Sequence, residues 1–350
     1  MHKILVYGSY GYTGQLIVHE CKRKNLQVIL AGRNAEALKK QSETSAYPYE
    51  VFSTDETEKL EQVLSKVSVV IHCGGPFRHT AKAMIQACIK TKTHYTDITG
   101  EYEVFEMART YDAQAKAAGI QIMPGTGFDV VPSDCLALHL KKQLPDATHL
   151  QLAFISSGGG LSRGTSKTMI EGMGYGGMIR KDGKLIRIKS GEKVMEIDFG
   201  TVKSKVVSIP WGDISTAYFS TGIPNIEVYT GVPDKLIKQL RRSNYINWLL
   251  RASWIKTFLK KKIEKKKAGP SAEHLVKGKS FLWGKVWNTE NKSVEAKLET
   301  LNGYALTAQA SVLIAEKILA GNFKAGYQTP ASAYGIELIL EIPPGKWLLA

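Results

Sequence analysis

Over the first 130 residues, short apolar runs alternate with longer stretches whose apolar positions recur at helical spacing. The apolar runs predict strands at 4–7, 28–31, 50–52, 67–73, 94–97 and 120–124. The stretches between them predict helices at 15–24, 34–41 (capped by Asn34), 56–66, 80–91 and 104–118. Strands that alternate with helices form a parallel sheet covered by helices. We therefore predict an α/β fold that begins with a Rossmann-type sheet.

After residue 130 the pattern changes to segments of alternating polarity. The sequence Lys181-Asp182-Gly183-Lys184 is typical of a hairpin turn. Further antiparallel strands are expected at 194–199, 204–209, 226–230, 280–286 and 293–298, with helices at 166–172 and 304–319. We predict a Rossmann domain over 1–130, a second α+β domain with a mixed, mainly antiparallel sheet over 131–325, and a return of the chain to the Rossmann domain over 326–350.

The first predicted strand runs into a glycine-rich turn that opens the first helix. Glycines spaced in this way let the chain turn tightly, let its backbone approach a pyrophosphate and let the helix pack on the sheet. The helix N-terminus offers peptide N–H groups and the positive end of its dipole to phosphates. Placed between a strand and a helix, the turn predicts a dinucleotide-binding loop rather than an idle turn. The residues assigned to the cofactor here are Gly8, Tyr10, Gly11, Tyr12, Thr13 and Gly14.

The end of the second strand bears on the choice between NAD and NADP. An NAD-binding chain usually carries an acid here, which binds the ribose hydroxyl. This chain has Ala31-Gly32-Arg33 and no acid before Glu36. A guanidinium at Arg33 suits a 2′-phosphate, so we predict NADP as the cofactor. The alternative is a solvated arginine at the start of a helix.

The loop after the fourth strand is the second part of the predicted cofactor site. It lies at the carboxyl end of the sheet near the topological switch point, where ligands bind. Phe77 could flank the nicotinamide, and Cys73 is interpreted as a small buried residue because no base is paired with it. The other residues assigned to the cofactor are Asp55, Cys73, Gly74, Gly75, Pro76, Phe77 and Asp97.

Three residues are the candidates for catalysis: Asp129, Arg163 and Asp213. Asp129 follows the sixth strand in a glycine-rich turn, where it could act as an acid or simply cap a helix. Arg163 lies with Lys167 at the start of a helix and suits a carboxylate or phosphate, or a structural ion pair. Asp213 belongs to a polar cluster in the second domain. The histidines show no metal-ligand pattern, and we expect no metal.

The net charge of +15 is concentrated in one segment. Between Lys235 and Lys267 there are twelve Lys and Arg residues and one acid, Glu264, a net charge of +11. Within this basic segment (residues 235–267), Trp248, Ala252, Ile255, Leu259 and Ile263 form one helical stripe. A second row contains Leu250, Trp254 and Phe258. The segment is typical of a helix at an anionic membrane surface, unless its second row packs on the protein and its lysines only keep it soluble.

The composition of the chain argues against several classes of protein. Four cysteines without a C-x-x-C pair argue against a disulfide framework and a zinc site. No apolar run is long enough for a membrane span, and the N-terminal run is too short for a signal peptide. The basic segment lacks a nucleic-acid reading motif, so we expect no nucleic-acid partner. We expect a cytoplasmic protein that can be peripheral at a membrane.

Several blocks of sequence resemble the saccharopine dehydrogenase-like group, and within it the trans-acting enoyl reductases most closely. Besides the two cofactor loops, they are Tyr95–Glu101, Pro124–Asp134, Ser162–Thr165, Ile209–Tyr218, Gly303–Thr307 and Thr329–Gly335. The resemblance implies that the second domain binds substrate and forms a homodimer. It also implies an NADPH-dependent oxidoreductase.

The reaction expected is hydride transfer to an enoyl, imine or carbonyl group of an apolar, acyl-type small molecule. The basic segment agrees with such a substrate, because a lipid-like molecule can be delivered from a membrane. Two alternatives remain. One is a saccharopine-type imine reductase, which needs several cations to bind its carboxylates. The other is a protein that binds NADP and docks on membranes without turnover.

Overall fold

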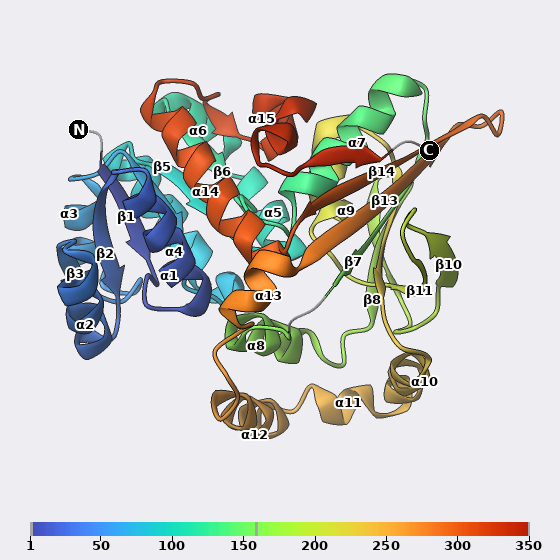
Figure 1. The fold of residues 1–350 in the computed structure, drawn as a ribbon, viewed down its shortest axis with the longest axis horizontal. Helices are drawn as coiled ribbons and strands as arrows, with labels where there is room; N and C mark the ends of the chain where they lie inside the picture. The colour runs from blue at the N-terminus through green and yellow to red at the C-terminus, as the bar shows by residue number, and fades with distance from the viewer. Residues whose placement is uncertain (1–2, 158–159, 349–350) are drawn as a thin grey trace. The chain divides into compact units, whose positions relative to one another are not determined.

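The computed structural model describes residues 3–157 and 160–348, which separate into two units (Figure 1). Of the described residues, unit 1 comprises 3–131 and 304–333, and unit 2 comprises 132–157, 160–303 and 334–348. Each unit is built around its own sheet. The predicted fold class, a Rossmann-type parallel sheet plus a mixed sheet, is confirmed.

Unit 1 contains a seven-stranded parallel sheet in the order β15-β6-β5-β4-β1-β2-β3. The apolar runs of the sequence form its centre, because residues 4–6 and 69–71 are completely buried. The strands are β1 (Lys3–Tyr7), β2 (Gln27–Gly32), β3 (Tyr49–Val51), β4 (Val69–His72), β5 (His94–Asp97), β6 (Gln121–Met123) and β15 (Gly326–Tyr327). The strand order reverses between β1 and β4, which makes the carboxyl ends of these two strands the topological switch point.

The helices of unit 1 connect these strands. They are α1 (Tyr12–Arg23), α2 (Ala35–Ser45), α3 (Thr57–Leu64), α4 (Phe77–Thr91), α5 (Tyr102–Arg109), α6 (Asp112–Ala118) and α14 (Gly303–Leu319). Asn34 caps α2 as predicted, since its side chain accepts a hydrogen bond from the Ala37 N–H at 2.9 Å. The single helix predicted at 104–118 is wrong. It is interrupted at Thr110 and Tyr111, whose N–H groups donate to the Met107 and Ala108 carbonyls, three residues back, while the Thr110 hydroxyl also donates to the Met107 carbonyl.

The boundary between the units also differs from the prediction. The helix at 304–319 was placed in the second domain, but the structure groups residues 304–333 with unit 1. There Ser311 of α14 donates to the buried Thr126 carbonyl, and β15 extends the parallel sheet beside β6. The predicted return over 326–350 is therefore split, because β16 (Lys346–Leu348) pairs with β14 of unit 2. Residues 349–350 of that range lie outside the described residues.

Unit 2 is built on a nine-stranded mixed sheet, with β10-β11-β12-β7-β13-β14-β16 along its main path and β8 and β9 attached through β12. Its other strands are β7 (His149–Ser156), β8 (Gly177–Lys181), β9 (Lys184–Ile188), β10 (Val194–Asp198), β11 (Lys203–Ser208), β12 (Asn225–Gly231), β13 (Lys279–Trp287) and β14 (Ser293–Leu301). The predicted hairpin joins β8 to β9, with Asp182 and Gly183 at positive φ. The sequence prediction omitted β7, and β12 pairs with it in parallel rather than antiparallel fashion.

The helices of unit 2 include the basic segment. They are α7 (Val131–Gln143), α8 (Arg163–Gly172), α9 (Asp213–Thr221), α10 (Asp234–Ser243), η1 (Asn244–Ile246), α11 (Asn247–Leu250), α12 (Ser253–Glu264), α13 (Ala272–Lys277) and η2 (Ile336–Glu341). The short α15 (Pro330–Tyr334) spans the point in the sequence at which unit 1 ends and unit 2 resumes. The stripe from Trp248 to Ile263 does not form one helix, because Ala252 has extended backbone angles and separates α11 from α12.

Candidate functional site

The loop between β1 and α1 is shaped by glycines. Gly8 has φ of +77°, a left-handed conformation that L side chains rarely adopt, and its N–H donates to the Ala31 carbonyl at 2.7 Å. The Gly11 N–H donates back to the Gly8 carbonyl at 3.0 Å. A Cβ on Gly14 would lie only 2.4 Å from the Gly8 carbonyl oxygen, so α1 could not begin this close to the strand with any other residue. The loop is partly exposed and accessible to a ligand.

The N-terminus of α1 has the properties of an anion site. Gly11 is its N-cap and supplies no side chain to the first peptide N–H groups, and the first turn contains no acid. These N–H groups and the helix dipole favour a phosphate at this position. The ring of Tyr12 meets the ring of Tyr304 edge to face, with centroids 5.2 Å apart, so α14 supports one side of the loop. Tyr304 belongs to the block Gly303–Thr307 of the family resemblance, which implies no role for it.

The loop after β4 touches the loop after β1 at the switch point. A Cβ on Gly8 would lie 2.9 Å from the Gly74 nitrogen, so the two backbones are in van der Waals contact. Burial lowers the pKa of His72 to about 3, which keeps this imidazole neutral. Thr80 donates to the Gly74 carbonyl at 2.9 Å and lies 2.8 Å from His72 Nε2, and the Gly74 N–H points to Nδ1 at 3.4 Å. Because the Thr80 proton is already used, His72 carries its own proton on Nε2.

The thiol of Cys73, in the same loop, is an unreactive group. Burial raises its pKa, and its sulfur lies 3.8 Å from the Ile71 carbonyl oxygen. A protonated thiol is a poor nucleophile. This agrees with the interpretation of Cys73 as a structural residue of the loop.

The N-terminus of α4 differs from that of α1, because a carboxylate of the protein occupies it. Glu101 is almost completely buried and accepts hydrogen bonds from the N–H groups of Phe77 at 2.9 Å and Arg78 at 3.2 Å. The Arg78 guanidinium also donates to Glu101 at 3.1 Å. The predicted role of Phe77 beside the nicotinamide stays a prediction, and the N–H groups of its helix are already satisfied.

Three predicted cofactor residues surround the end of β2. A Cβ on Gly32 would lie 2.5 Å from the Tyr10 ring, so Tyr10 packs on the backbone where β2 ends. The Tyr10 hydroxyl accepts from the Arg33 N–H at 3.3 Å, and the Arg33 side chain is exposed. Burial raises the pKa of Tyr7 to about 12, the charge of Arg33 opposes this rise, and Tyr10 and Asp55 add to it. Arg33, Tyr10 and Asp55 therefore all lie close enough to the Tyr7 hydroxyl to affect its pKa.

Asp97 is fully buried and is bound on all sides by protein donors. Its carboxylate accepts from the Tyr95 hydroxyl at 2.5 Å and from the N–H groups of Thr99 and Gly125 at 2.9 and 2.8 Å. Burial raises the pKa of the Asp97 carboxyl to about 6, although these donors favour its charged form. Asp97 thus joins the end of β5 to the loop after β6. A direct contact with the cofactor stays a prediction.

Asp129 lies beside the loop that follows β5. A Cβ on Gly100 would be 2.6 Å from Asp129 Oδ2, so the carboxyl group rests on the Gly100 backbone. Gly100 precedes Glu101, which holds the first residues of α4 and hence the loop after β4. Burial raises the pKa of Asp129 to about 7, although part of the residue remains exposed. Asp129 is therefore a carboxyl group that can be protonated near neutral pH, on the β4–β5 side of the switch point.

The other two catalytic candidates belong to unit 2 and have structural neighbours. Arg163 begins α8 and donates to the Glu264 carbonyl at 3.3 Å, while Lys167 pairs with the Glu264 carboxylate at 2.9 Å. Asp213 begins α9, is completely buried and accepts from the Ser133 hydroxyl at 2.7 Å. These contacts correspond to the structural alternatives for both residues. Their predicted catalytic roles stay predictions.

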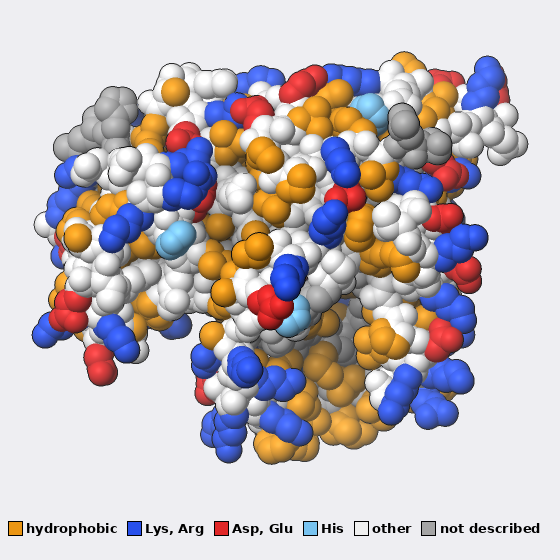
Figure 2. Space-filling view, in the orientation of Figure 1, with side chains coloured by type: hydrophobic (Ala, Val, Ile, Leu, Met, Phe, Trp, Pro, Cys, Tyr) orange, Lys and Arg blue, Asp and Glu red, His pale blue; other side chains and the backbone are white. Residues whose placement is uncertain are grey.

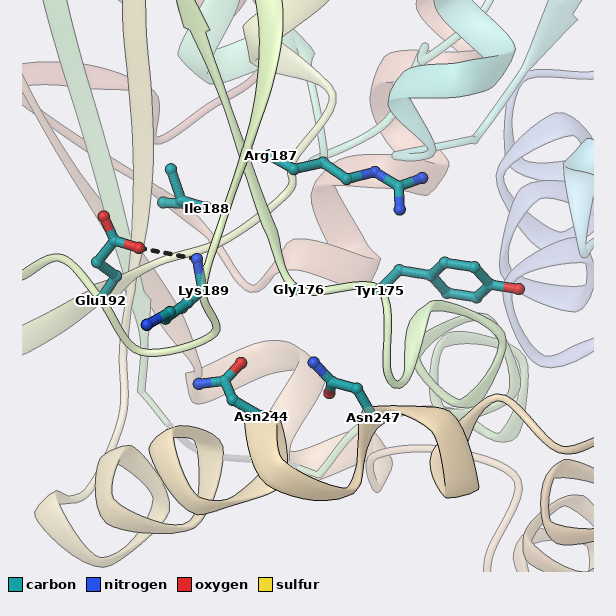
Figure 3. A pocket seen from close by; sticks show the side chains of 8 residues that line it. All are labelled: Tyr175, Gly176, Arg187, Ile188, Lys189, Glu192, Asn244 and Asn247. Atoms are coloured by element: carbon teal, nitrogen blue, oxygen red, sulfur yellow. Dashed lines mark hydrogen bonds between the residues drawn. The ribbon is translucent and has the colours of Figure 1, made fainter.

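Unit 2 contains a polar pocket that the sequence analysis missed. The pocket has a volume of about 440 Å³ and lies between the β8–β9 hairpin and the η1–α11 segment (Figure 3). Its lining residues are Tyr175, Gly176, Arg187, Ile188, Lys189, Glu192, Asn244 and Asn247. Cationic groups also surround the Tyr175 ring, with the Arg251 guanidinium at 5.3 Å and the Lys256 ammonium at 4.8 Å from its centroid. No sequence motif marks this pocket, because separate exposed segments form it.

Residues 4–123 match the family model of the saccharopine dehydrogenase NADP binding domain. This match covers the loop after β1, Arg33 and the loop after β4. It confirms the resemblance stated from the sequence for this part of the chain. It also confirms NADP as the cofactor of this domain.

Several known proteins are similar in sequence to part of this chain. The matches include a saccharopine dehydrogenase-like oxidoreductase of Rattus norvegicus, 26% identical over 51% of this chain and 48% of that protein. A lipid droplet localized protein of Caenorhabditis elegans is 28% identical over 49% of this chain and 45% of that protein. A trans-acting enoyl reductase of Mycobacterium ulcerans is 28% identical over 40% of this chain and 36% of that protein. The chain thus matches half or less of the length of these relatives.

The fold as a whole is similar to that of an apo saccharopine dehydrogenase (L-Glu forming) from Saccharomyces cerevisiae. The two chains align with a TM-score of 0.67 over 99% of this chain and 100% of that one, at 12% identity. This similarity shows that the present chain shares its fold with that protein.

Proposed function

We propose that this chain is an NADPH-dependent oxidoreductase that transfers hydride to an enoyl, imine or carbonyl group of an apolar, acyl-type substrate. The observation that carries the proposal is the pair of loops in contact at the switch point, one of which opens an uncapped helix. An exposed arginine stands where β2 ends. This combination suits a dinucleotide with a 2′-phosphate.

Each part of the cofactor has residues that fit it. The pyrophosphate would meet the peptide N–H groups that follow Gly11, and the 2′-phosphate would meet Arg33 beside the Tyr10 ring. The nicotinamide would lie toward the loop after β4, which the neutral His72 and Thr80 hold in place. When bound, NADPH supplies the hydride. The protein orients the substrate and handles the accompanying proton.

Asp129 is the proposed proton donor. Reduction of an enoyl, imine or carbonyl group adds a hydride to carbon and a proton to the adjacent atom. A carboxyl group with a pKa of about 7 is protonated in much of the population at neutral pH and can release this proton. Its deprotonated form then regains a proton from solvent, because the residue is partly exposed.

We propose an apolar substrate rather than a carboxylate-rich imine. A saccharopine-type substrate requires several cations, and the two cations singled out for this role, Arg163 and Lys167, both bind Glu264. Two relatives carry names that agree with the proposal, an enoyl reductase and a saccharopine dehydrogenase-like oxidoreductase. We also propose that unit 2 forms a homodimer, as the family resemblance implies.

The proposal is tested by NADPH oxidation with the purified protein and a panel of long-chain enoyl thioesters, apolar ketones and a lysine–keto acid mixture that forms an imine. We expect turnover with an apolar member of the panel and none with the imine. Turnover of the imine alone would replace the proposal by saccharopine-type chemistry. Tight NADPH binding without oxidation across the panel would favour a non-catalytic protein.

Asp129→Asn should reduce kcat by about 10²- to 10⁴-fold, because an amide cannot donate the proton. The carboxyl group is protonated below its pKa of about 7, so wild-type kcat should be constant at lower pH and fall as pH rises through 7. In Asp129→Asn this fall should disappear while NADPH binding is retained. Asp234→Asn, which removes an exposed carboxylate of the Lys205 ion pair, is the matched control and should behave as wild type. An unchanged pH profile in Asp129→Asn would exclude Asp129 as the donor.

A further inference from the structure

Aromatic side chains are concentrated on the outside of the basic segment. Of the fifteen large hydrophobic side chains described as exposed, six lie between Leu236 and Phe258. Four of these are aromatic, and we call them the aromatic patch: Tyr245, Trp248, Trp254 and Phe258, which are 86%, 72%, 67% and 64% exposed. Scattered single apolar residues are ordinary on a protein surface, but a local concentration of aromatic rings marks an interaction site.

In the η1–α11 part of the basic segment, polar side chains face the protein and aromatic side chains face the solvent. Its asparagines, Asn244 and Asn247, face the polar pocket of unit 2 (Figure 3). Asn244 exchanges two hydrogen bonds with the backbone of Ser190, at 3.0 and 2.9 Å. Tyr245 and Trp248 of the same turns remain in solvent. A segment that only packs on the protein would bury its rings and expose its amides, so this arrangement requires another explanation.

The helix α12 separates two apolar rows. Ile255, Leu259 and Ile263 are half-buried on the side that packs against α8, whereas Trp254 and Phe258 are exposed. Lys256 and Lys260 stabilise the contact between α12 and α8, because both bind Glu171 of α8. Trp254 and Phe258 of the second row therefore do not pack on the protein, contrary to the alternative stated from the sequence.

The exposed face of α12 continues into a group of lysines. At 100° per residue, Lys261 and Lys265 project on the same side as Trp254 and Phe258. Lys262, Lys266 and Lys267 flank them and are exposed as well. We call these five residues the lysine cluster. Among the described residues, the structure gives none of the five an ion pair with an acid, in contrast to Lys256 and Lys260.

The two features share one edge of unit 2. In Figure 2, hydrophobic side chains gather at the lower edge, where α11 lies in Figure 1, and Lys and Arg side chains flank them on both sides. An apolar centre with a cationic border is the chemical complement of a bilayer surface, which offers acyl chains beneath anionic headgroups.

We propose that the aromatic patch and the lysine cluster together form a docking surface for an anionic phospholipid membrane. The aromatic rings enter the interfacial region, where amphipathic tryptophan and tyrosine are favoured. The lysines extend their aliphatic stems along the bilayer surface and place their ammonium groups among the headgroup phosphates. The helices lie in the plane of the interface. Among the described residues, no helix is long and apolar enough to cross the membrane.

Charge and shape favour a membrane over other partners. A single-stranded nucleic acid could neutralise the lysines and stack its bases on the rings, but it offers no apolar phase for the exposed aliphatic side chains of Leu236 and Ile246 in the same segment. A second copy of the chain would oppose one lysine cluster to another, and like charges repel. A membrane meets both requirements on one surface. The C. elegans relative named for lipid droplets agrees with a lipid surface as partner.

The test is co-sedimentation of the full chain with sucrose-loaded vesicles. Vesicles of phosphatidylcholine alone are compared with vesicles that also contain phosphatidylserine. We expect binding to the anionic vesicles that weakens as ionic strength rises, and little binding to neutral ones. Equal binding to both compositions, or binding to neither, would overturn the proposal.

Two variants separate the contributions of charge and apolar surface. Replacing the five residues of the lysine cluster by Gln should weaken binding to anionic vesicles by about three orders of magnitude, at about fivefold per lysine. Trp248→Ser, Trp254→Ser and Phe258→Ser together should weaken it by about tenfold or more. The matched control replaces five exposed lysines outside the segment by Gln: Lys82, Lys142, Lys181, Lys184 and Lys203. If this control weakens binding as much as the cluster variant, the docking surface is not the segment.

Direct insertion of the rings is measured by fluorescence. Lipids brominated on their acyl chains should quench the tryptophan emission of the wild type, and Trp248→Phe with Trp254→Phe should remove most of this quenching while sedimentation remains. Unfolding midpoints should stay unchanged in all variants, because the altered side chains are exposed. NADPH binding should also be unchanged, so failure here leaves the proposed reductase function untouched. Quenching that persists in the double variant would contradict the proposal.

Discussion

The two helices that begin at the switch point of unit 1 differ in the acceptors that the protein provides at their N-termini. The helix α1 follows a glycine-rich loop, and its N-cap, Gly11, provides no side chain to the first peptide N–H groups. The helix α4 also follows two glycines, but there the buried Glu101 accepts from the first N–H groups. Both sites attract negative charge for the same reason, the first peptide N–H groups of the helix and the positive end of its dipole.

The difference indicates which of the two loops binds phosphate. A helix end whose donors are satisfied by the protein has little to offer an anionic ligand, and the charge of Glu101 would repel it. The N-cap of helix α1 supplies no such acceptor, and the helix begins in a partly exposed loop. The loop after β4 therefore contributes shape and backbone contact to the cofactor site, while the loop after β1 contributes the electrostatic attraction.

The largest effect is expected for Gly14→Ala. The added Cβ would lie 2.4 Å from the Gly8 carbonyl oxygen, so the helix must move away from the loop that it opens. NADPH affinity should fall by more than about 100-fold, since the pyrophosphate donors are displaced. Isothermal titration measures this loss. Gly172→Ala is the control, because a Cβ there meets nothing within 4 Å, and normal affinity in Gly14→Ala would contradict the assignment of this loop.

The next effect concerns stability rather than binding. Glu101→Ala leaves the N–H groups of Phe77 and Arg78 without their acceptor in a buried place, which should lower the free energy of unfolding by about 2–3 kcal/mol. Urea denaturation measures it. Glu103→Ala removes an exposed partner of the same Arg78 and should cost less than about 1 kcal/mol. Equal losses in the two variants would remove the distinction between the two helix N-termini.

The smallest of these effects should be selective for one cofactor. Arg33→Ala should weaken NADPH binding by about 10- to 100-fold, because a charged hydrogen-bond partner of the 2′-phosphate is lost. NADH, which lacks this phosphate, should bind as to the wild type. Lys39→Ala, an exposed cation of α2, is the control. Equal weakening of both dinucleotides would show that Arg33 does not read the 2′-phosphate.

Much of the cofactor site could be predicted because its signals are local. The spacing of Gly8, Gly11 and Gly14 follows from backbone geometry within seven residues, and Asn34 acts on a helix that starts at the next residue. Arg33 was identified by the absence of an acid at a known place after β2. The raised pKa of Asp129, by contrast, follows from its burial in the folded chain, where the carboxyl group lies against Gly100 of a different loop. No local pattern could have revealed it.

The parts of the prediction that failed depend on long-range packing. The helix α14 is apolar on most of its surface, so its sequence predicts a buried helix without saying which sheet buries it. Contacts such as that between Ser311 and Thr126 place it in unit 1. The central strand β7 was overlooked, although its neighbours β12 and β13 were recognised. Strand pairing joins residues far apart in the sequence, and the pairing order is a property of the folded sheet.

The basic segment shows most clearly what each level decides. Its charge of +11 and its two apolar rows follow from the sequence alone, because composition and helical spacing require no tertiary information. Whether Trp254 and Phe258 face the protein or the solvent depends on which row packs against α8. Packing leaves Ile255, Leu259 and Ile263 half-buried against α8, where Lys256 and Lys260 bind Glu171, and it leaves the rings and the lysine cluster exposed. A helix can bury only one of its faces against a single neighbour, so only the tertiary structure could select the face left for a partner.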